Sequence, residues 1–215
     1  MVLGISFLAV VAVILAFRKQ FNDAVFGGNG SGKTTFMIKV AISYMKKYTK
    51  KRVLFIIPDD SESKLDVVPE ISVEEIGTFQ GIAKLIVEDD SVFEYILNYF
   101  GNKKNKFNGL MIIDDPGVFL KRRPERVLKL FRRRRQVNID FLWGFHGLKT
   151  EMPPAFFAYL NRIYLLETSD NHKYTMDLLP DAKKTEFEQK YQKVQNLAAQ
   201  GVKYHMEEIV IRSTV

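Results

Sequence analysis

The feature that most constrains this chain is a glycine-rich segment, GGNGSGKT, at residues 27–34. It matches the pattern G-x-x-x-x-G-K-[ST] at every fixed position, and it lies between a short apolar run and an amphipathic segment. Glycines let such a loop turn successive backbone N–H groups inward, and the N-terminus of the helix that follows adds positive potential. The segment therefore predicts a phosphate-binding loop between a strand and a helix.

We expect this loop to hold ATP, with Lys33 reaching the β- and γ-phosphates and the Thr34 hydroxyl acting as a ligand of Mg²⁺. ATP and Mg²⁺ are therefore the expected cofactors. The residues expected to line the nucleotide site are Gly27, Gly28, Asn29, Gly30, Ser31, Gly32, Lys33, Thr34 and Thr35.

A phosphate loop of this kind needs a second acidic group from a neighbouring strand, and residues 110–115 (LMIIDD) supply a hydrophobic run that ends in two aspartates. We expect Asp114 to complete the Mg²⁺ shell and Asp115 to orient or deprotonate the attacking water. Either acid could instead be a loop residue that caps a turn at Pro116.

Short apolar runs alternate with amphipathic ones, which predicts an α/β fold with a mostly parallel central sheet flanked by helices. We expect strands at residues 23–26, 52–57, 71–76, 109–114, 140–145 and 162–167. We expect helices at residues 33–47, 81–88, 91–100, 124–136 and 181–200, with Ser91 and Asp181 as caps, and a short helix that begins at Pro153 and Pro154. A last apolar segment lies near residues 209–211, so residues 20–179 would form the ATPase domain and residues 180–215 a helix-and-strand extension.

The first 17 residues carry no charge, and Arg18 and Lys19 follow them directly. At about 1.5 Å per residue this run spans about 26 Å as a helix, slightly less than a hydrocarbon core of about 30 Å. A signal peptide would need a basic segment before the apolar run, and this chain has none there. A helix buried in the core or at an interface is the remaining alternative to a membrane anchor. We expect residues 1–19 to form a hydrophobic helix that anchors the chain to a membrane through residues 1–17, with the ATPase domain on the cytoplasmic side.

The positive charge of the chain is concentrated in residues 121–135, which hold nine basic residues and one acid, while the whole chain carries +7. At 100° per residue, Arg126, Lys129 and Arg133 form an outward stripe, and Arg134 and Arg135 fall on or beside the buried face. A solvated surface, contact with the DNA phosphate backbone and contact with an acidic membrane all fit the stripe. The absence of cysteine excludes a disulfide scaffold, a thiolate zinc site and a cysteine nucleophile.

Over residues 23–170, the order of phosphate loop, acidic strand, arginine-rich helix and further strand resembles the FtsK–HerA superfamily of DNA-pumping P-loop ATPases. That superfamily includes viral genome-packaging ATPases, and the zonula-occludens-toxin-like assembly ATPases of filamentous phages are similar. The resemblance implies an ATP-hydrolysing motor that translocates DNA as a homo-oligomeric ring, for example a hexamer, with catalytic roles for Lys33 and Asp115. It also implies a polar sensor at His146 and an arginine finger at Arg134 or Arg135. The family usually has Asp-Glu where this chain has Asp114-Asp115, and the shorter side chain reaches less far.

Three other functions stay open on the sequence. A membrane-anchored assembly or secretion ATPase would use the same site to move a filament or protein subunits, and the apolar N-terminus favours it. A small-molecule kinase shares the phosphate loop, but it accounts for neither the apolar run nor the basic stripe. A nucleotide-gated adaptor would lack hydrolysis. For the motor, both a membrane-associated and a virion-associated location are expected settings.

Overall fold

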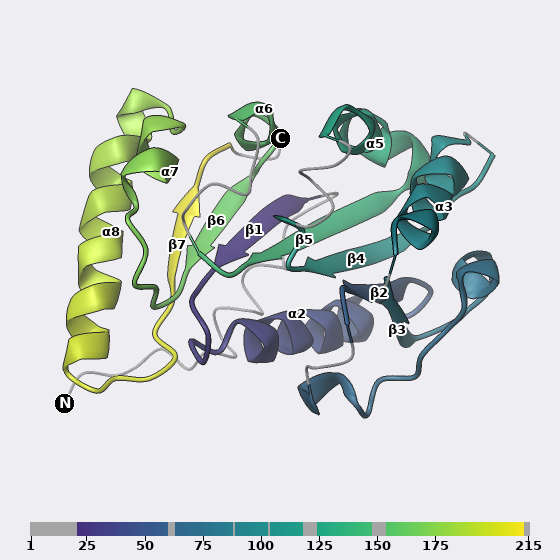
Figure 1. Ribbon diagram of the computed structural model, residues 1–215, viewed down its shortest axis with the longest axis horizontal. Helices are drawn as coiled ribbons and strands as arrows, with labels where there is room; N and C mark the ends of the chain where they lie inside the picture. Colours follow the sequence, from purple (N-terminus) through teal and green to yellow (C-terminus); the bar gives the residue numbers. More distant parts are fainter. Residues whose placement is uncertain are drawn as a thin grey trace.

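The computed structural model describes residues 21–59, 63–87, 89–102, 104–117, 124–147 and 154–212. These residues form a seven-stranded sheet in the order β3-β2-β4-β5-β1-β6-β7 (Figure 1). Its strands are β1 (Asn22–Phe26), β2 (Arg52–Ile57), β3 (Ile82–Ile86), β4 (Gly109–Asp114), β5 (Ile139–Phe145), β6 (Arg162–Leu165) and β7 (Glu207–Val210). All neighbouring strands are parallel except β6 and β7, which are antiparallel. The predicted α/β architecture with a mostly parallel sheet is confirmed.

Helices cover both faces of this sheet. They are α2 (Lys33–Lys47), α3 (Asp90–Gly101), α5 (Pro124–Val137), α6 (Pro154–Phe157), α7 (Lys173–Asp177) and α8 (Asp181–Ala199), with 3₁₀ turns η1 (Ser63–Leu65) and η2 (Val73–Gly77). Helix α2 packs on one face, and α3, α5, α6 and α8 contribute to the core on the other (Figure 1). Within the described ranges no helix is both long and apolar enough to cross a membrane. The predicted hydrophobic helix at residues 1–19 falls outside those ranges.

The two hydrophobic cores follow from the alternation of side chains along the strands. In β2, Val53 and Phe55 pack on the α2 side, whereas Leu54 and Ile56 pack on the other side. All four side chains are buried, as expected for a strand with helices above and below it. The run of apolar residues predicted as a buried strand therefore serves both cores.

Two predicted elements between β2 and α3 are wrong. Residues 71–76, predicted as a strand, overlap the η2 turn, and a capping box between Ser72 and Glu75 favours that helical conformation. Residues 81–88, predicted as helical, contain strand β3, which pairs with β2 along its length. The segment is only five residues long, so pairing with an existing strand outweighs a helix too short to be stable.

Smaller differences concern the ends of helices. Asp89, rather than Ser91, is the N-cap of α3, because its carboxylate accepts hydrogen bonds from the backbone N–H groups of Ser91 and Val92. Asp181 is the first residue of α8 and Pro180 is its N-cap. Helix α7 was not predicted, and α2 and β2 have the predicted bounds.

A buried hydrogen bond joins the end of α2 to the start of β5. The Tyr44 hydroxyl donates to Asp140 Oδ2 at 2.6 Å, and the Phe21 amide donates to Asp140 Oδ1 at 2.9 Å. Lys51 Nζ lies 3.5 Å from the same carboxylate. Burial raises the pKa of Asp140 in spite of these partners.

We predict that Tyr44→Phe lowers the free energy of unfolding by about 1–3 kcal/mol, the usual range when a buried acceptor loses its donor. The hydroxyl stabilises the charged carboxylate, so the loss should grow as the pH rises through the raised pKa of Asp140 and shrink in acid. Denaturant unfolding at several pH values measures this. Tyr95→Phe, at a surface tyrosine of α3, is the control; equal midpoints for the two variants would contradict the prediction.

Candidate active site

The glycine-rich segment is a loop held by the two strands that flank β1. The Gly27 amide donates to the Phe145 carbonyl of β5 at 3.1 Å, and the Gly28 amide donates to the Glu167 carbonyl after β6 at 2.8 Å. The loop therefore sits at the carboxyl edge of the parallel strands, where ligands bind in α/β sheets.

Two glycines are required by the shape of the loop. Gly32, the N-cap of α2, has φ 92°, in the left-handed region that favours glycine, and it offers no side-chain cap to the helix. A Cβ on Gly27 would lie 2.4 Å from Ser31 Oγ and 2.9 Å from Leu166 Cβ. The amide end of α2 is thereby left for a ligand rather than for a capping side chain.

Lys33 and Asp114 meet beneath this loop. Lys33 Nζ lies 3.2 Å from Asp114 Oδ1, and both side chains are almost fully buried. Lys33 Nζ and Ser31 Oγ are buried polar atoms that lack a hydrogen-bond partner among the described residues. A buried ammonium and a buried hydroxyl without hydrogen-bond partners can donate to the oxygens of a phosphate, so the residues present suit the expected nucleotide.

The position of Asp114 also depends on a glycine in the next strand. A Cβ on Gly144 would lie 2.7 Å from Asp114 Oδ1 and 2.8 Å from Met37 Sδ, so a side chain at this position would displace the carboxylate or Met37. Thr34 is 5% exposed at the first turn of α2, next to Lys33. A buried hydroxyl and a carboxylate are oxygen ligands of the kind that Mg²⁺ prefers, so Thr34 and Asp114 suit the metal.

Asp115 leaves the strand in an unusual conformation, with φ 46°. Its amide donates to the Gly144 carbonyl at 2.9 Å and to Asp114 Oδ1 at 3.1 Å, and these two bonds hold the left-handed turn. His146 Nε2 lies 3.9 Å from Asp115 Oδ2, and both side chains reach solvent. The structure thus brings the two residues together at the ends of β4 and β5.

A cavity of 550 Å³ opens beside these groups, at the ends of three adjacent strands. The loops after β1, β5 and β6 line it with Gly28, Asn29, His146, Gly147, Thr168, Ser169 and Asp170. The Asp170 carboxylate lies against Gly147, since a Cβ there would overlap it. Glycine loop, aspartates and His146 therefore share one site at one edge of the sheet.

The two arginines predicted as candidate arginine fingers lie near the amino ends of the parallel strands, whereas the phosphate loop lies at their carboxyl ends. Arg134 donates to Asn161 Oδ1 at 3.4 Å, and the same oxygen accepts from the Asn22 amide at the start of β1. The phosphate loop follows the end of β1, so Arg134 is a strand's length away from the loop of its own chain. Arg135 is exposed. Arg134, which was expected on or beside the buried face of the helix, is half-buried.

Two of the three residues in the predicted outward stripe of α5 contact α3. Arg126 pairs with Glu94 and donates to Asn98 Oδ1 at 2.5 Å, and Arg133 donates to the Gly101 carbonyl at 2.6 Å. These contacts hold both arginines against α3, which the periodicity of a single helix could not reveal. Lys129 is exposed, and residues 121–123 of the basic run lie outside the described part of the chain.

The sheet order, the glycine loop and the Lys33–Asp114 pair together define a P-loop ATPase. The profile of the family described as Poxvirus A32 protein matches residues 15–150, and the chain belongs to this family. The resemblance to viral packaging ATPases found in the sequence is confirmed. No curated protein matches the sequence of the chain.

Solved structures share the fold at low sequence identity. The genome packaging NTPase B204 from Sulfolobus turreted icosahedral virus 2, in complex with AMP, matches with a TM-score of 0.68 and 13% identity, covering 91% of this chain and 94% of that one. The DNA-packaging ATPase B204 from Sulfolobus turreted icosahedral virus matches with a TM-score of 0.65 and 15% identity, covering 88% and 91%. EssC (ATPases 2 and 3) from Geobacillus thermodenitrificans matches with a TM-score of 0.51 and 14% identity, covering 73% of this chain and 34% of that one.

Sequence reasoning missed some residues at this site. Gly144 lies inside a predicted strand, and an isolated glycine there is a signal of close approach by a neighbour. Thr168 and Asp170 follow β6, and their place beside Gly28 depends on β6 pairing with β1, which no local motif encodes.

We predict that Asp115→Asn keeps Mg-ATP binding but slows hydrolysis by about 10²-fold or more, because an amide cannot accept the proton of the water. Asp114→Asn should instead weaken the dependence of nucleotide binding on Mg²⁺. Single-turnover hydrolysis and titration with and without Mg²⁺ separate the two effects. Asp66→Asn, at an exposed loop residue, is the matched control; full turnover by Asp115→Asn would place the base elsewhere.

Proposed function

We propose that this ATPase translocates DNA, and that its biological role is viral genome packaging. The observation that carries the proposal is the buried Lys33 ammonium, 3.2 Å from Asp114 beneath a complete phosphate loop, in a chain of the Poxvirus A32 protein family. Support comes from the shared fold with B204, whose structures contain AMP, AMPPCP and ATP-gammaS.

In the proposed reaction the phosphate loop and Lys33 bind the triphosphate, and Lys33 neutralises charge that develops on the γ-phosphate. Mg²⁺, when bound by Thr34 and Asp114, would add positive charge to the same phosphates. Asp115 would accept a proton from the attacking water, because its carboxylate reaches solvent at the end of β4 and lies 3.9 Å from His146 Nε2. His146 would sense the state of the γ-phosphate through this contact.

The arginine finger fits a ring better than a single chain. Arg134 and Arg135 lie at the sheet edge opposite the phosphate loop, so either could complete an active site only in a neighbouring subunit. We therefore propose a homo-oligomeric ring, for example a hexamer, in which an arginine of one subunit contacts the nucleotide bound by the next.

Contact with DNA is proposed for the exposed cations of α5, such as Lys129 and Arg132. Their charge suits the phosphate backbone and carries no information about base sequence. The assembly or secretion ATPase considered from the sequence is not favoured by the comparisons.

We predict that duplex or single-stranded DNA stimulates ATP hydrolysis by the full chain. Charge reversal of Lys129 and Arg132 together should weaken DNA binding and lower the log–log salt slope by about 0.7–0.9 for each lost phosphate contact, with basal hydrolysis kept. Reversal of Lys46 and Lys50, two exposed lysines on and after α2, is the charge-matched control. Lys33→Ala should abolish both basal and DNA-stimulated ATP hydrolysis. A rate of ATP hydrolysis by the native chain that does not change when DNA is added would contradict the proposed DNA translocation.

We also propose that residues 1–17 tether the ATPase to a membrane, with the catalytic domain on the cytoplasmic side. The support is their lack of any charge, followed by Arg18 and Lys19. Removing residues 1–17 should move the protein from the membrane fraction to the supernatant and leave ATP binding intact. A truncated chain that stays with the membrane fraction, or that aggregates, would overturn the tether.

A further inference from the structure

The turn between α8 and β7, at residues 200–206, lies beside the phosphate loop although it comes near the end of the chain (Figure 1). The ring of Tyr204 rests on Gly32, because a Cβ on that glycine would lie 2.5 Å from Tyr204 Cδ1 and 3.2 Å from Cε1. Gly32 is the N-cap of α2, so the aromatic ring sits next to the helix end that is expected to bind phosphate.

Tyr204 is placed there at a cost. Its backbone has φ 64°, which is unfavourable for a residue with a large side chain, and its side chain is not buried in return. The residue is 57% exposed, and Val202 in the same turn is 44% exposed. Backbone strain combined with an exposed aromatic ring is typical of residues that serve a ligand rather than the core.

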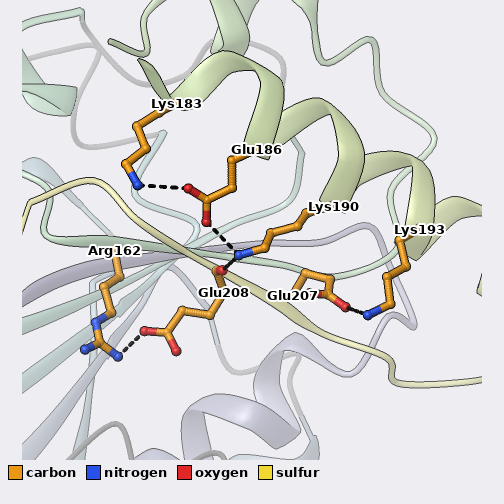
Figure 2. A network of polar contacts seen from close by, with 7 residues as sticks. All are labelled: Arg162, Lys183, Glu186, Lys190, Lys193, Glu207 and Glu208. Atoms are coloured by element: carbon orange, nitrogen blue, oxygen red, sulfur yellow. Dashed lines mark hydrogen bonds and ion pairs between the residues drawn. The ribbon is translucent and has the colours of Figure 1, made fainter. Parts of the chain in front are cut away.

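The turn is held in place by charged contacts between α8, β6 and β7. Figure 2 shows these contacts among seven residues, namely Arg162, Lys183, Glu186, Lys190, Lys193, Glu207 and Glu208. Lys190 Nζ lies 2.7 Å from Glu186 Oε1 and donates to the Glu208 carbonyl at 2.6 Å, and Lys193 pairs with Glu207 at 2.5 Å. The start of β7 is therefore fixed against the last turns of α8.

His205, next to Tyr204, is fixed by the same carboxylate. Its Nε2 lies 2.8 Å from Glu207 Oε1. Burial acts to raise the pKa of Glu207, but the hydrogen bonds from Lys193 and His205 outweigh it and hold that pKa below its ordinary value. The Glu207 carboxylate therefore contacts both Lys193 of α8 and His205 of the turn.

The order of the strands indicates that the nucleoside end of a bound nucleotide lies toward the α8–β7 turn. Asp114 lies at the end of β4, on one side of β1, and this is where the terminal phosphate and the attacking water would meet. β6 and β7 lie on the other side of β1, and the antiparallel direction of β7 brings its first residue to the edge that holds the phosphate loop. A triphosphate whose γ end faces Asp114 therefore directs its nucleoside toward Tyr204.

We infer that Tyr204 is the base-stacking residue of this site, and that the α8–β7 turn forms the side of the pocket that receives the nucleobase. The inference rests on nucleotide binding at the phosphate loop, as proposed above, and it adds a residue for the half of the ligand that the loop does not hold. An exposed aromatic ring can stack on a base through its face without selecting one base strictly.

The test compares two ligands that share the phosphates and differ in the nucleoside, namely ATP and inorganic tripolyphosphate, by calorimetric titration of the full chain with Mg²⁺. Tyr204→Ala should weaken ATP binding by about 5- to 150-fold, the range for loss of one base–aromatic stack, and leave tripolyphosphate binding unchanged. Tyr204→Phe, which keeps the ring, should restore ATP binding. Tyr174→Ala, at an exposed tyrosine of α7, is the matched control and should change neither ligand.

The outcomes separate this inference from the proposed function. Equal losses for both ligands in Tyr204→Ala, or no loss for either, would overturn the stacking role while ATP binding by the native chain still stands. Failure of the native chain to bind either ligand would overturn nucleotide binding itself, and the stacking role with it. Lys33→Ala should weaken both ligands, and it marks the response expected from a phosphate contact. An unchanged unfolding temperature of the free Tyr204→Ala protein checks that the turn still folds.

Discussion

The buried ammonium of Lys33 needs a negative partner, and without a nucleotide the Asp114 carboxylate is the group that supplies it. An uncompensated charge at this depth would cost several kcal/mol, so Lys33 holds α2 to the end of β4. The pairing leaves Lys33 Nζ without a well-directed hydrogen bond, so this buried ammonium can still donate hydrogen bonds to a ligand. In the proposed reaction, phosphate oxygens would take the place of this partner, and the Asp114 carboxylate would then be available to the proposed Mg²⁺.

Several features of the sheet position Lys33 and Asp114 for this contact. β5 lies between β4 and β1, so it separates the acidic strand from the strand that leads into the phosphate loop. Gly144 on β5 leaves the space that the Asp114 carboxylate and Met37 fill from two sides. The turn at Asp115 then takes the second aspartate away from the buried pair and toward solvent. The two neighbouring carboxylates therefore have different surroundings: Asp114 is buried beside Lys33, and Asp115 reaches solvent beside His146.

The sequence predicted those parts of the site whose residues are close together in the chain. The phosphate loop, helix α2 and the run ending at Asp114 and Asp115 could be read directly, because motif and periodicity are local. The region between β2 and α3 could not, since β3 owes its conformation to pairing with β2 and η2 to a capping box. The contact of Tyr204 with Gly32 and of Arg126 with Glu94 joins distant segments, and no spacing along the chain encodes either.

Because β7 is antiparallel to β6, it runs from the carboxyl ends of the parallel strands to their amino ends. Its four residues span about 13 Å at roughly 3.3 Å per residue. One end follows Tyr204 at the phosphate loop, and just beyond the other end the Ile211 and Arg212 amides donate to the Asn161 carbonyl at 2.9 Å and 3.1 Å. Asn161 in turn accepts from Arg134 through its side chain. A paired strand is stiff along its length, so a displacement of the turn along β7 would either break the hydrogen bonds to β6 or move the contacts that Ile211 and Arg212 make with Asn161.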